Sequence, residues 1–322
     1  GKRINVVSKP VVFVPGPIAP EGITRLEEFC PASAPWLQNK PCDEIPEEAE
    51  AIMVRIFSLT QKRITAATNL RVIAKHGVGF DNIDVSCANS RNIKVVWTPE
   101  ANAESVSQHT IALMLALSNR IIHANHGVRS GNFDERMMWK SMELQGRTLG
   151  IIGLGRIGNR TAHKAIHGFG MNTIAYDPYI NQVTSKNSVR LVPTLKELLE
   201  ESDYISLHVP LTKETNKLIN FDRISAMKPG SFLINTSRGE TVDIDALSSA
   251  LESGHIAGAG LDVFPQEPPN LNHRIFSSPN ALLTPHIAGL SDRSVVRVAT
   301  EAADGIIDVL QGRNPRYEVP KT

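Results

Sequence analysis

Three side chains that together could bind an organic acid and exchange a proton with it lie in the last third of the chain. Arg238, Glu267 and His286 each come just beyond an apolar run typical of a buried strand, and His208 follows an earlier run in the same way. Ligands of open parallel sheets bind at the carboxyl ends of strands. Each residue also has an ordinary explanation: a surface ion pair for the arginine, a structural role for the histidine, plain solvation for the glutamate. Their joint occurrence at strand ends favours a site.

The chemistry of this set fits the reduction of a 2-oxo acid by hydride transfer. Arginine offers a planar, bidentate fork for a carboxylate. Histidine titrates near neutral pH, so it can give a proton to a carbonyl oxygen or take one from a hydroxyl. A neighbouring carboxylate favours the imidazolium and orients the ring. A bound nicotinamide would supply the hydride.

A glycine-rich turn within residues 148–178 indicates where that cofactor binds. An apolar run leads into Gly153-Leu154-Gly155-Arg156-Ile157-Gly158, then into a helical pattern, a second apolar run and Asp177. These glycines permit a tight turn, close approach of a pyrophosphate and close packing of helix on strand, and the acid can bind the adenosine ribose. The acid also predicts NAD rather than NADP, because it would repel the extra phosphate. The alternative is a βαβ unit that binds nothing or another nucleotide.

Composition limits the remaining classes of function. A chain of 322 residues with 41% hydrophobic and 21% charged residues predicts two globular domains. A formal net charge of +1 argues against a general nucleic-acid surface. The three cysteines lack metal-like spacing and predict reduced thiols, and no apolar run has the length of a membrane span. We therefore expect a cytoplasmic protein without a metal site or a membrane partner.

The elements that must position these residues alternate along the chain, which predicts a doubly wound parallel sheet embedded in a second α/β domain. We expect helices at 22–29, 103–118, 121–130, 195–200, 223–227, 243–253 and 291–311, with a further helix ending at 65–69. We expect strands at 11–14, 51–56, 70–74, 92–97, 149–152, 173–176, 204–209, 231–235, 258–263 and 281–284.

Seven short sequence motifs match the pattern of a known protein family. In chain order they are KHGVGFDNID (75–84), ANAESVSQHT (101–110), GIIGLGRIG (150–158), HVPLTKET (208–215), INTSRGE (234–240), GLDVFPQEP (260–268) and TPHIAG (284–289). With these motifs the chain resembles the D-2-hydroxyacid dehydrogenase family, which includes D-3-phosphoglycerate dehydrogenase and glyoxylate/hydroxypyruvate reductase. The family pattern usually has Ala-Glu where this chain has Ser107-Gln108.

The resemblance implies a role for each matched residue. Arg238 would bind the substrate carboxylate, His286 would be the acid/base, and Glu267 its partner. The substrate would also contact the backbone at Gly77 and Val78, and Arg55 is a further candidate. The residues implied at the NAD cofactor are Gly153, Gly155, Arg156, Ile157, Gly158, Asp177, His208, Thr236 and Asp262.

The resemblance also implies two Rossmann-like domains. A flavodoxin-like substrate-binding domain would comprise residues 1–102 and 289–322, the NAD-binding domain would be 103–288, and the active site would lie in the cleft. We expect a homodimer that acts on a small 2-oxo or D-2-hydroxy acid.

Two alternatives and one open question remain at this stage. A formate-type dehydrogenase would pair its histidine with Gln, which Glu267 argues against. A corepressor-like binding protein could keep the same fold, NAD site and Arg/Glu/His set. The substrate stays open among glycerate, 3-phosphoglycerate, glycolate, lactate and others, because Arg55 fits a phosphate-binding arginine and a surface arginine about equally well.

Overall fold

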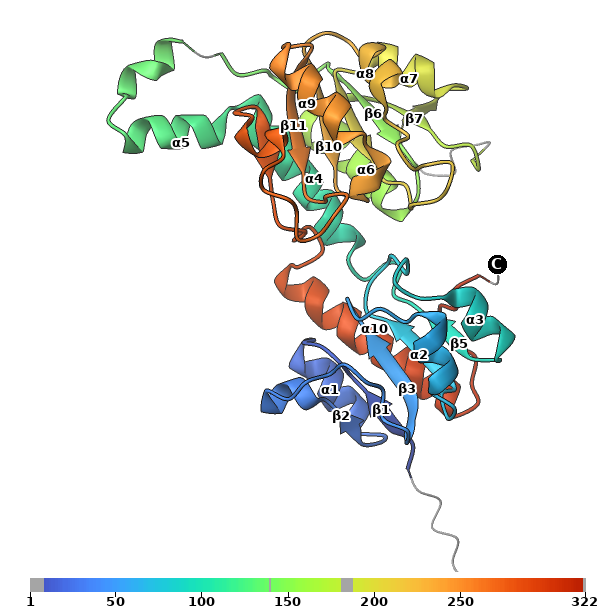
Figure 1. The fold of residues 1–322 in the computed structure, drawn as a ribbon. Coiled ribbons are helices and arrows are strands. Elements are labelled where there is room, and N and C mark those ends of the chain that lie inside the picture. The colour runs from blue at the N-terminus through green and yellow to red at the C-terminus, as the bar shows by residue number, and fades with distance from the viewer. Residues whose placement is uncertain (1–8, 139, 181–187, 321–322) are drawn as a thin grey trace, which may run out of the picture. The chain divides into compact units, whose positions relative to one another are not determined.

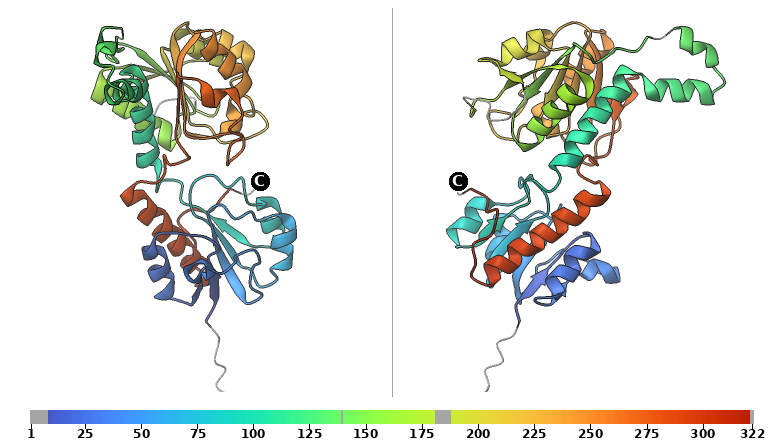
Figure 2. Two further views of the ribbon diagram at one scale, coloured as in Figure 1. Left: turned by 60° about the vertical axis from the view of Figure 1, so that its left-hand side comes forward. Right: turned by 180° about the vertical axis from the view of Figure 1, so that it is seen from behind.

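The computed structural model describes residues 9–138, 140–180 and 188–320. Two compact units divide the chain: unit 1 holds residues up to 102 together with those from 290 onward, and unit 2 holds residues 103–289. Each unit is built on one parallel sheet with helices (Figures 1 and 2). The predicted α/β fold class with doubly wound sheets is confirmed.

Unit 1 has a five-stranded sheet in the order β2-β1-β3-β4-β5, the flavodoxin-like order. Successive residues of the central strand point to opposite faces: Ala51 and Met53 enter one apolar cluster with helix α10, and Ile52 and Val54 enter the other. The strands are β1 (Val11–Phe13), β2 (Ala32–Ser33), β3 (Ala49–Val54), β4 (Val72–Lys75) and β5 (Lys94–Val96). The helices are α1 (Pro20–Glu27), α2 (Gln61–Ala66), α3 (Val85–Ser90) and α10 (Asp292–Leu310).

Unit 2 has a seven-stranded sheet in the order β12-β11-β10-β9-β6-β7-β8, which is the dinucleotide-binding order with one strand added at an edge. The strands are β6 (Thr148–Ile152), β7 (Asn172–Tyr176), β8 (Val189–Leu191), β9 (Tyr204–Leu207), β10 (Ser231–Asn235), β11 (Ile256–Leu261) and β12 (Ala281–Leu283). The helices are α4 (Ala103–Ser118), α5 (Ile121–Arg129), α6 (Arg156–Phe169), α7 (Leu195–Glu201), α8 (Phe221–Ser225) and α9 (Ile244–Glu252).

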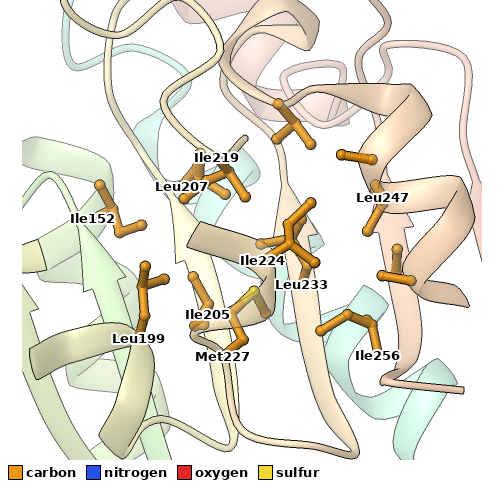
Figure 3. Close-up of a cluster of buried hydrophobic side chains, with 14 of the residues drawn as sticks. Ile152, Leu199, Ile205, Leu207, Ile219, Ile224, Met227, Leu233, Leu247 and Ile256 are labelled. Carbon is orange, nitrogen blue, oxygen red and sulfur yellow. The ribbon is translucent and has the colours of Figure 1, made fainter. Parts of the chain in front are cut away.

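Both faces of this second sheet are covered by helices. On one face, side chains of the strands pack with Leu199 of α7, Ile224 of α8 and Leu247 of α9, as Figure 3 shows. On the other face, α4 and α6 bury Met114 and Ala165 against the sheet. Because both faces of the sheet are buried, its strands consist mainly of apolar residues. This is why the sequence pattern predicted the strands.

Short elements and element ends differ from the sequence prediction. Helix α3 and strands β2 and β8 were not predicted from the sequence. The strand expected at 204–209 ends at Leu207, and the helix expected at 223–227 begins at Phe221 because the Asn220 side chain caps it by accepting from the Arg223 N–H. The described residues also form four short 3₁₀ helices: Pro35–Gln38, Phe133–Met137, Gly239–Thr241 and Arg274–Ser277. Within the described ranges, no helix combines the length and apolar character needed to cross a bilayer.

Candidate active site

His286 and Glu267 lie side by side beyond the carboxyl ends of β12 and β11. The Nδ1 atom of His286 is 2.7 Å from Oε2 of Glu267, and Oε1 of Glu267 accepts the Phe264 N–H at 3.1 Å. Since the carboxylate has no proton to give, Nδ1 of the ring is the donor. The other ring nitrogen, Nε2, is therefore the atom that can exchange a proton with a ligand.

The segment that carries this histidine, the His286 loop (residues 284–289), is held by a buried carboxylate. Asp262 has no exposed surface. Its Oδ1 accepts the Thr284 hydroxyl at 2.6 Å and the Ile287 N–H at 2.9 Å, and its Oδ2 accepts the Ala288 N–H at 2.9 Å. Three donors from one loop thus converge on a single side chain.

Arg238 lies in a second loop, the Arg238 loop (residues 236–240), that follows the neighbouring strand β10. Its backbone carbonyl accepts hydrogen bonds from Asn235 Nδ2 at 2.9 Å and Thr241 Oγ1 at 2.6 Å, and its own guanidinium donates to the Ser237 carbonyl at 2.7 Å. The backbone of this arginine is therefore fixed.

Gly239 brings this loop against the one that carries Glu267. A Cβ at position 239 would lie 1.9 Å from the Phe264 carbonyl carbon, so only glycine permits the approach. Because β10, β11 and β12 are adjacent, the structure brings together the loops of Arg238, Glu267 and His286 at one edge of the sheet. Gly239 was not singled out in the sequence, where it followed the arginine as an ordinary strand-end glycine.

The glycine-rich turn has the shape that a pyrophosphate requires. Gly153 has a φ of +90°, and a Cβ there would lie 2.7 Å from the His208 carbonyl oxygen. A Cβ at Gly158 would lie 2.2 Å from the Gly153 carbonyl oxygen. At Gly155, the N-cap of α6, no atom lies within 4 Å of the Cβ position, so space is open beside the first turn of the helix. These residues fit a dinucleotide.

Asp177 is oriented by the same turn. Its Oδ2 accepts the Leu154 N–H at 2.9 Å and its Oδ1 accepts the Tyr179 N–H at 3.0 Å. The predicted ribose-binding carboxylate therefore lies next to the predicted phosphate-binding turn.

His208 and Thr236 follow β9 and β10. Desolvation lowers the pKa of His208 to about 3, so its ring is neutral, and Nε2 lies 2.8 Å from the Ser206 hydroxyl. The Thr236 hydroxyl lies 3.0 Å from that of Thr110 on α4. The environment of His208 thus excludes a charged imidazole near the turn.

The remaining predicted residues belong to unit 1. Arg55 follows β3, and Gly77, with a φ of +130°, follows β4 and donates its N–H to Thr98 Oγ1 at 3.1 Å. Two nearby residues, Lys75 and His76, were not among the site residues predicted from the sequence. Lys75 donates to the Arg55 carbonyl and to Asn82, and burial together with the Arg55 charge lowers the pKa of His76 to about 4.

No group of three or more His, Cys, Asp or Glu side chains among the described residues is placed to hold a metal ion.

Comparisons with known proteins agree on one family. The family model described as D-isomer specific 2-hydroxyacid dehydrogenase, NAD binding domain, matches residues 111–288. The chain is 39% identical to glyoxylate reductase from Korarchaeum cryptofilum, with 95% of each chain covered. It is 40% identical to D-3-phosphoglycerate dehydrogenase from a Synechocystis strain, over 86% of this chain but only half the length of that relative.

A solved structure shares the whole architecture. The NADPH-dependent glyoxylate/hydroxypyruvate reductase from Sinorhizobium meliloti, in complex with NADP and malonate, superposes with a TM-score of 0.85 at 32% identity. The alignment covers 97% of both chains.

Proposed function

The chain belongs to the D-isomer-specific 2-hydroxyacid dehydrogenase family, and we propose that it interconverts a 2-oxo acid and the D-2-hydroxy acid with a nicotinamide dinucleotide. The observation that carries this proposal is the 2.7 Å bond between His286 Nδ1 and Glu267 Oε2, beside the Arg238 loop. It supports an acid/base and a carboxylate-binding cation at one sheet edge.

In this proposal His286 moves the proton. With Nδ1–H directed to Glu267, Nε2 donates to the carbonyl oxygen during reduction and accepts the hydroxyl proton during oxidation. Glu267 keeps the ring orientation fixed and stabilises the imidazolium by its negative charge. The bound nicotinamide supplies or receives the hydride.

Arg238 binds the carboxylate of the acid in the same proposal. Its fixed backbone limits the positions that the guanidinium can take, which favours one orientation of the bound acid. We also propose Gly77 and Val78 as backbone donors to the substrate and Arg55 as a further substrate residue. Unit 1 would accordingly be the substrate-binding domain.

Unit 2 would bind NAD rather than NADP. The residues proposed at the cofactor are Gly153, Gly155, Arg156, Ile157, Gly158, Asp177, His208, Thr236 and Asp262. Asp177 supports the preference for NAD, because a carboxylate next to the turn repels a 2′-phosphate. The Sinorhizobium relative uses NADPH, so the preference has to be measured on this chain.

We propose that the chain is a homodimer joined through an arm of unit 2, residues 121–138. Helix α5 extends away from the sheet in Figure 1 and in the right-hand view of Figure 2. The large apolar residues on this arm are at least half exposed in a single chain, and a second copy of the chain would cover them. These side chains are Ile121, Ile122, Val128, Phe133, Met137 and Met138. Sedimentation of a Phe133→Asp/Met137→Asp variant tests this: monomers are expected, and a persistent dimer would overturn it.

One assay tests the catalytic proposal. The purified chain is mixed with NADH or NADPH and with glyoxylate, hydroxypyruvate, pyruvate or phosphohydroxypyruvate, and nucleotide absorbance is followed. Reduction of at least one acid is expected. If every acid fails with both nucleotides although they bind, the corepressor-like alternative replaces the enzyme.

A further inference from the structure

A histidine outside the predicted site, His109, lies against the support of the His286 loop. It belongs to helix α4, its side chain is 20% exposed, and its Nε2 is 3.0 Å from the Thr284 hydroxyl and 3.6 Å from Asp262 Oδ1. Nothing in the proposed reaction uses this side chain directly.

The direction of these hydrogen bonds follows from a count of protons. Both oxygens of Asp262 accept backbone N–H groups, and the Thr284 hydroxyl donates its one proton to Oδ1 at 2.6 Å. The Thr284 oxygen can then only accept from His109. Nε2 of His109 therefore carries a hydrogen and donates it.

Helix α4 holds the His286 loop at two levels. Ser105, one turn before His109 and on the same helix face, donates its hydroxyl to the Ala288 carbonyl at 2.6 Å. The helix thus fixes positions 284 and 288, on either side of His286. His286 itself has a φ of +54°, a left-handed backbone conformation. This conformation is unfavourable for residues other than glycine and persists only where the surrounding structure enforces it.

We propose that His109 is a positioning residue that acts through Thr284 and Asp262 to hold His286 in place; the inference rests on the proposed acid/base role of His286. Without the His109 donor, the Thr284 hydroxyl loses one of its two hydrogen-bond partners. The buried Asp262 also loses the side chain that lies next to its Oδ1 atom. The His286 loop then moves more, and the ring spends less time where Nε2 can reach the substrate.

The test uses three variants of the full chain. His109→Leu removes the donor, and His109→Gln replaces it with an amide N–H of similar reach. His255→Leu is the matched control, because the Nε2 of that histidine also makes one hydrogen bond, 2.9 Å from the Ile224 carbonyl and away from the His286 loop. Amide hydrogen exchange of peptides spanning residues 284–289 is measured alongside kcat and KM.

For His109→Leu we expect exchange at Ile287 and Ala288 to be faster and kcat to fall, each about tenfold, as the loss of one buried hydrogen bond predicts. The KM for the 2-oxo acid should stay close to that of the unaltered chain, His109→Gln should restore both values, and His255→Leu should change neither. If His109→Leu does not fold, Thr284→Val, which keeps the histidine and removes the bridging hydroxyl, is expected to give the same faster exchange.

Unchanged exchange of the loop in His109→Leu would overturn the inference, as would a His109→Gln variant as defective as His109→Leu. Because exchange needs no substrate, it decides the role of His109 even if the chain reduces none of the acids, in which case the proposed function fails separately.

Discussion

Glu267 spans two partners, with Oε2 on His286 Nδ1 at 2.7 Å and Oε1 on the Phe264 N–H at 3.1 Å. Each carboxylate oxygen is thus committed to one donor. The glutamate both orients the ring and ties it to the loop that packs against Gly239.

Replacing Glu267 by Gln should lower kcat by about tenfold to a hundredfold, by the usual size of acid–base contributions. A glutamine has one oxygen, so it can satisfy the Phe264 N–H or the His286 Nδ1–H but not both. Steady-state kinetics with NADH checks this, with the exposed Glu200→Gln as control. A kcat equal to that of the unaltered chain would show that the pair has no part in turnover.

Arg238→Lys should raise the KM for the 2-oxo acid by about tenfold or more and also lower kcat, because an ammonium cannot form the bidentate contact with a carboxylate. NADH binding, followed by fluorescence, should not change. The surface substitution Arg190→Lys controls for loss of an ordinary arginine. If Arg238→Lys leaves KM unaltered, the carboxylate binds elsewhere.

Cofactor preference should depend on Asp177. The unaltered chain should use NADH at least about tenfold more efficiently than NADPH, since the carboxylate held by the Leu154 N–H repels the 2′-phosphate. Asp177→Ser removes that charge and should narrow the ratio of the two kcat/KM values. Equal efficiency with both nucleotides in the unaltered chain would contradict the assignment.

The parallel sheets could be predicted because their strands are buried on both faces and therefore read as apolar runs between turn residues. The glycine-rich turn and its acid were visible for a similar reason, since their order is local. The contacts that hold the site loops in place could not be predicted, because they join segments that are distant in the sequence. His109 contacts Thr284, and Gly239 contacts Phe264, only after the sheet has formed. A histidine within an apolar helix gives no sign of such a partner.

The stability of the chain should fall as the pH drops below about 6.5, the ordinary pKa of histidine in an unfolded chain. Desolvation lowers the pKa of His208 to about 3 in the folded chain. Between these two values the unfolded state binds a proton that the folded state does not, so the free energy of unfolding decreases toward low pH. His76, with a pKa lowered to about 4, acts in the same direction.

Urea unfolding at pH 7.5, 6.5, 5.5 and 4.5 measures this dependence. His208→Asn removes one titrating group and should flatten the dependence of the free energy of unfolding on pH below pH 6.5. An unaltered slope in His208→Asn would mean that His208 takes up its proton equally well in both states.

The most direct test of the account is the turnover of His286→Asn. Asparagine tolerates the left-handed backbone at this position, so the loop should keep its conformation while the proton donor is lost. With the best 2-oxo acid found and saturating NADH, we expect kcat to fall by about a hundredfold or more while NADH binding is retained. A kcat near that of the unaltered chain would contradict the central claim that His286 is the acid/base of a 2-hydroxyacid dehydrogenase.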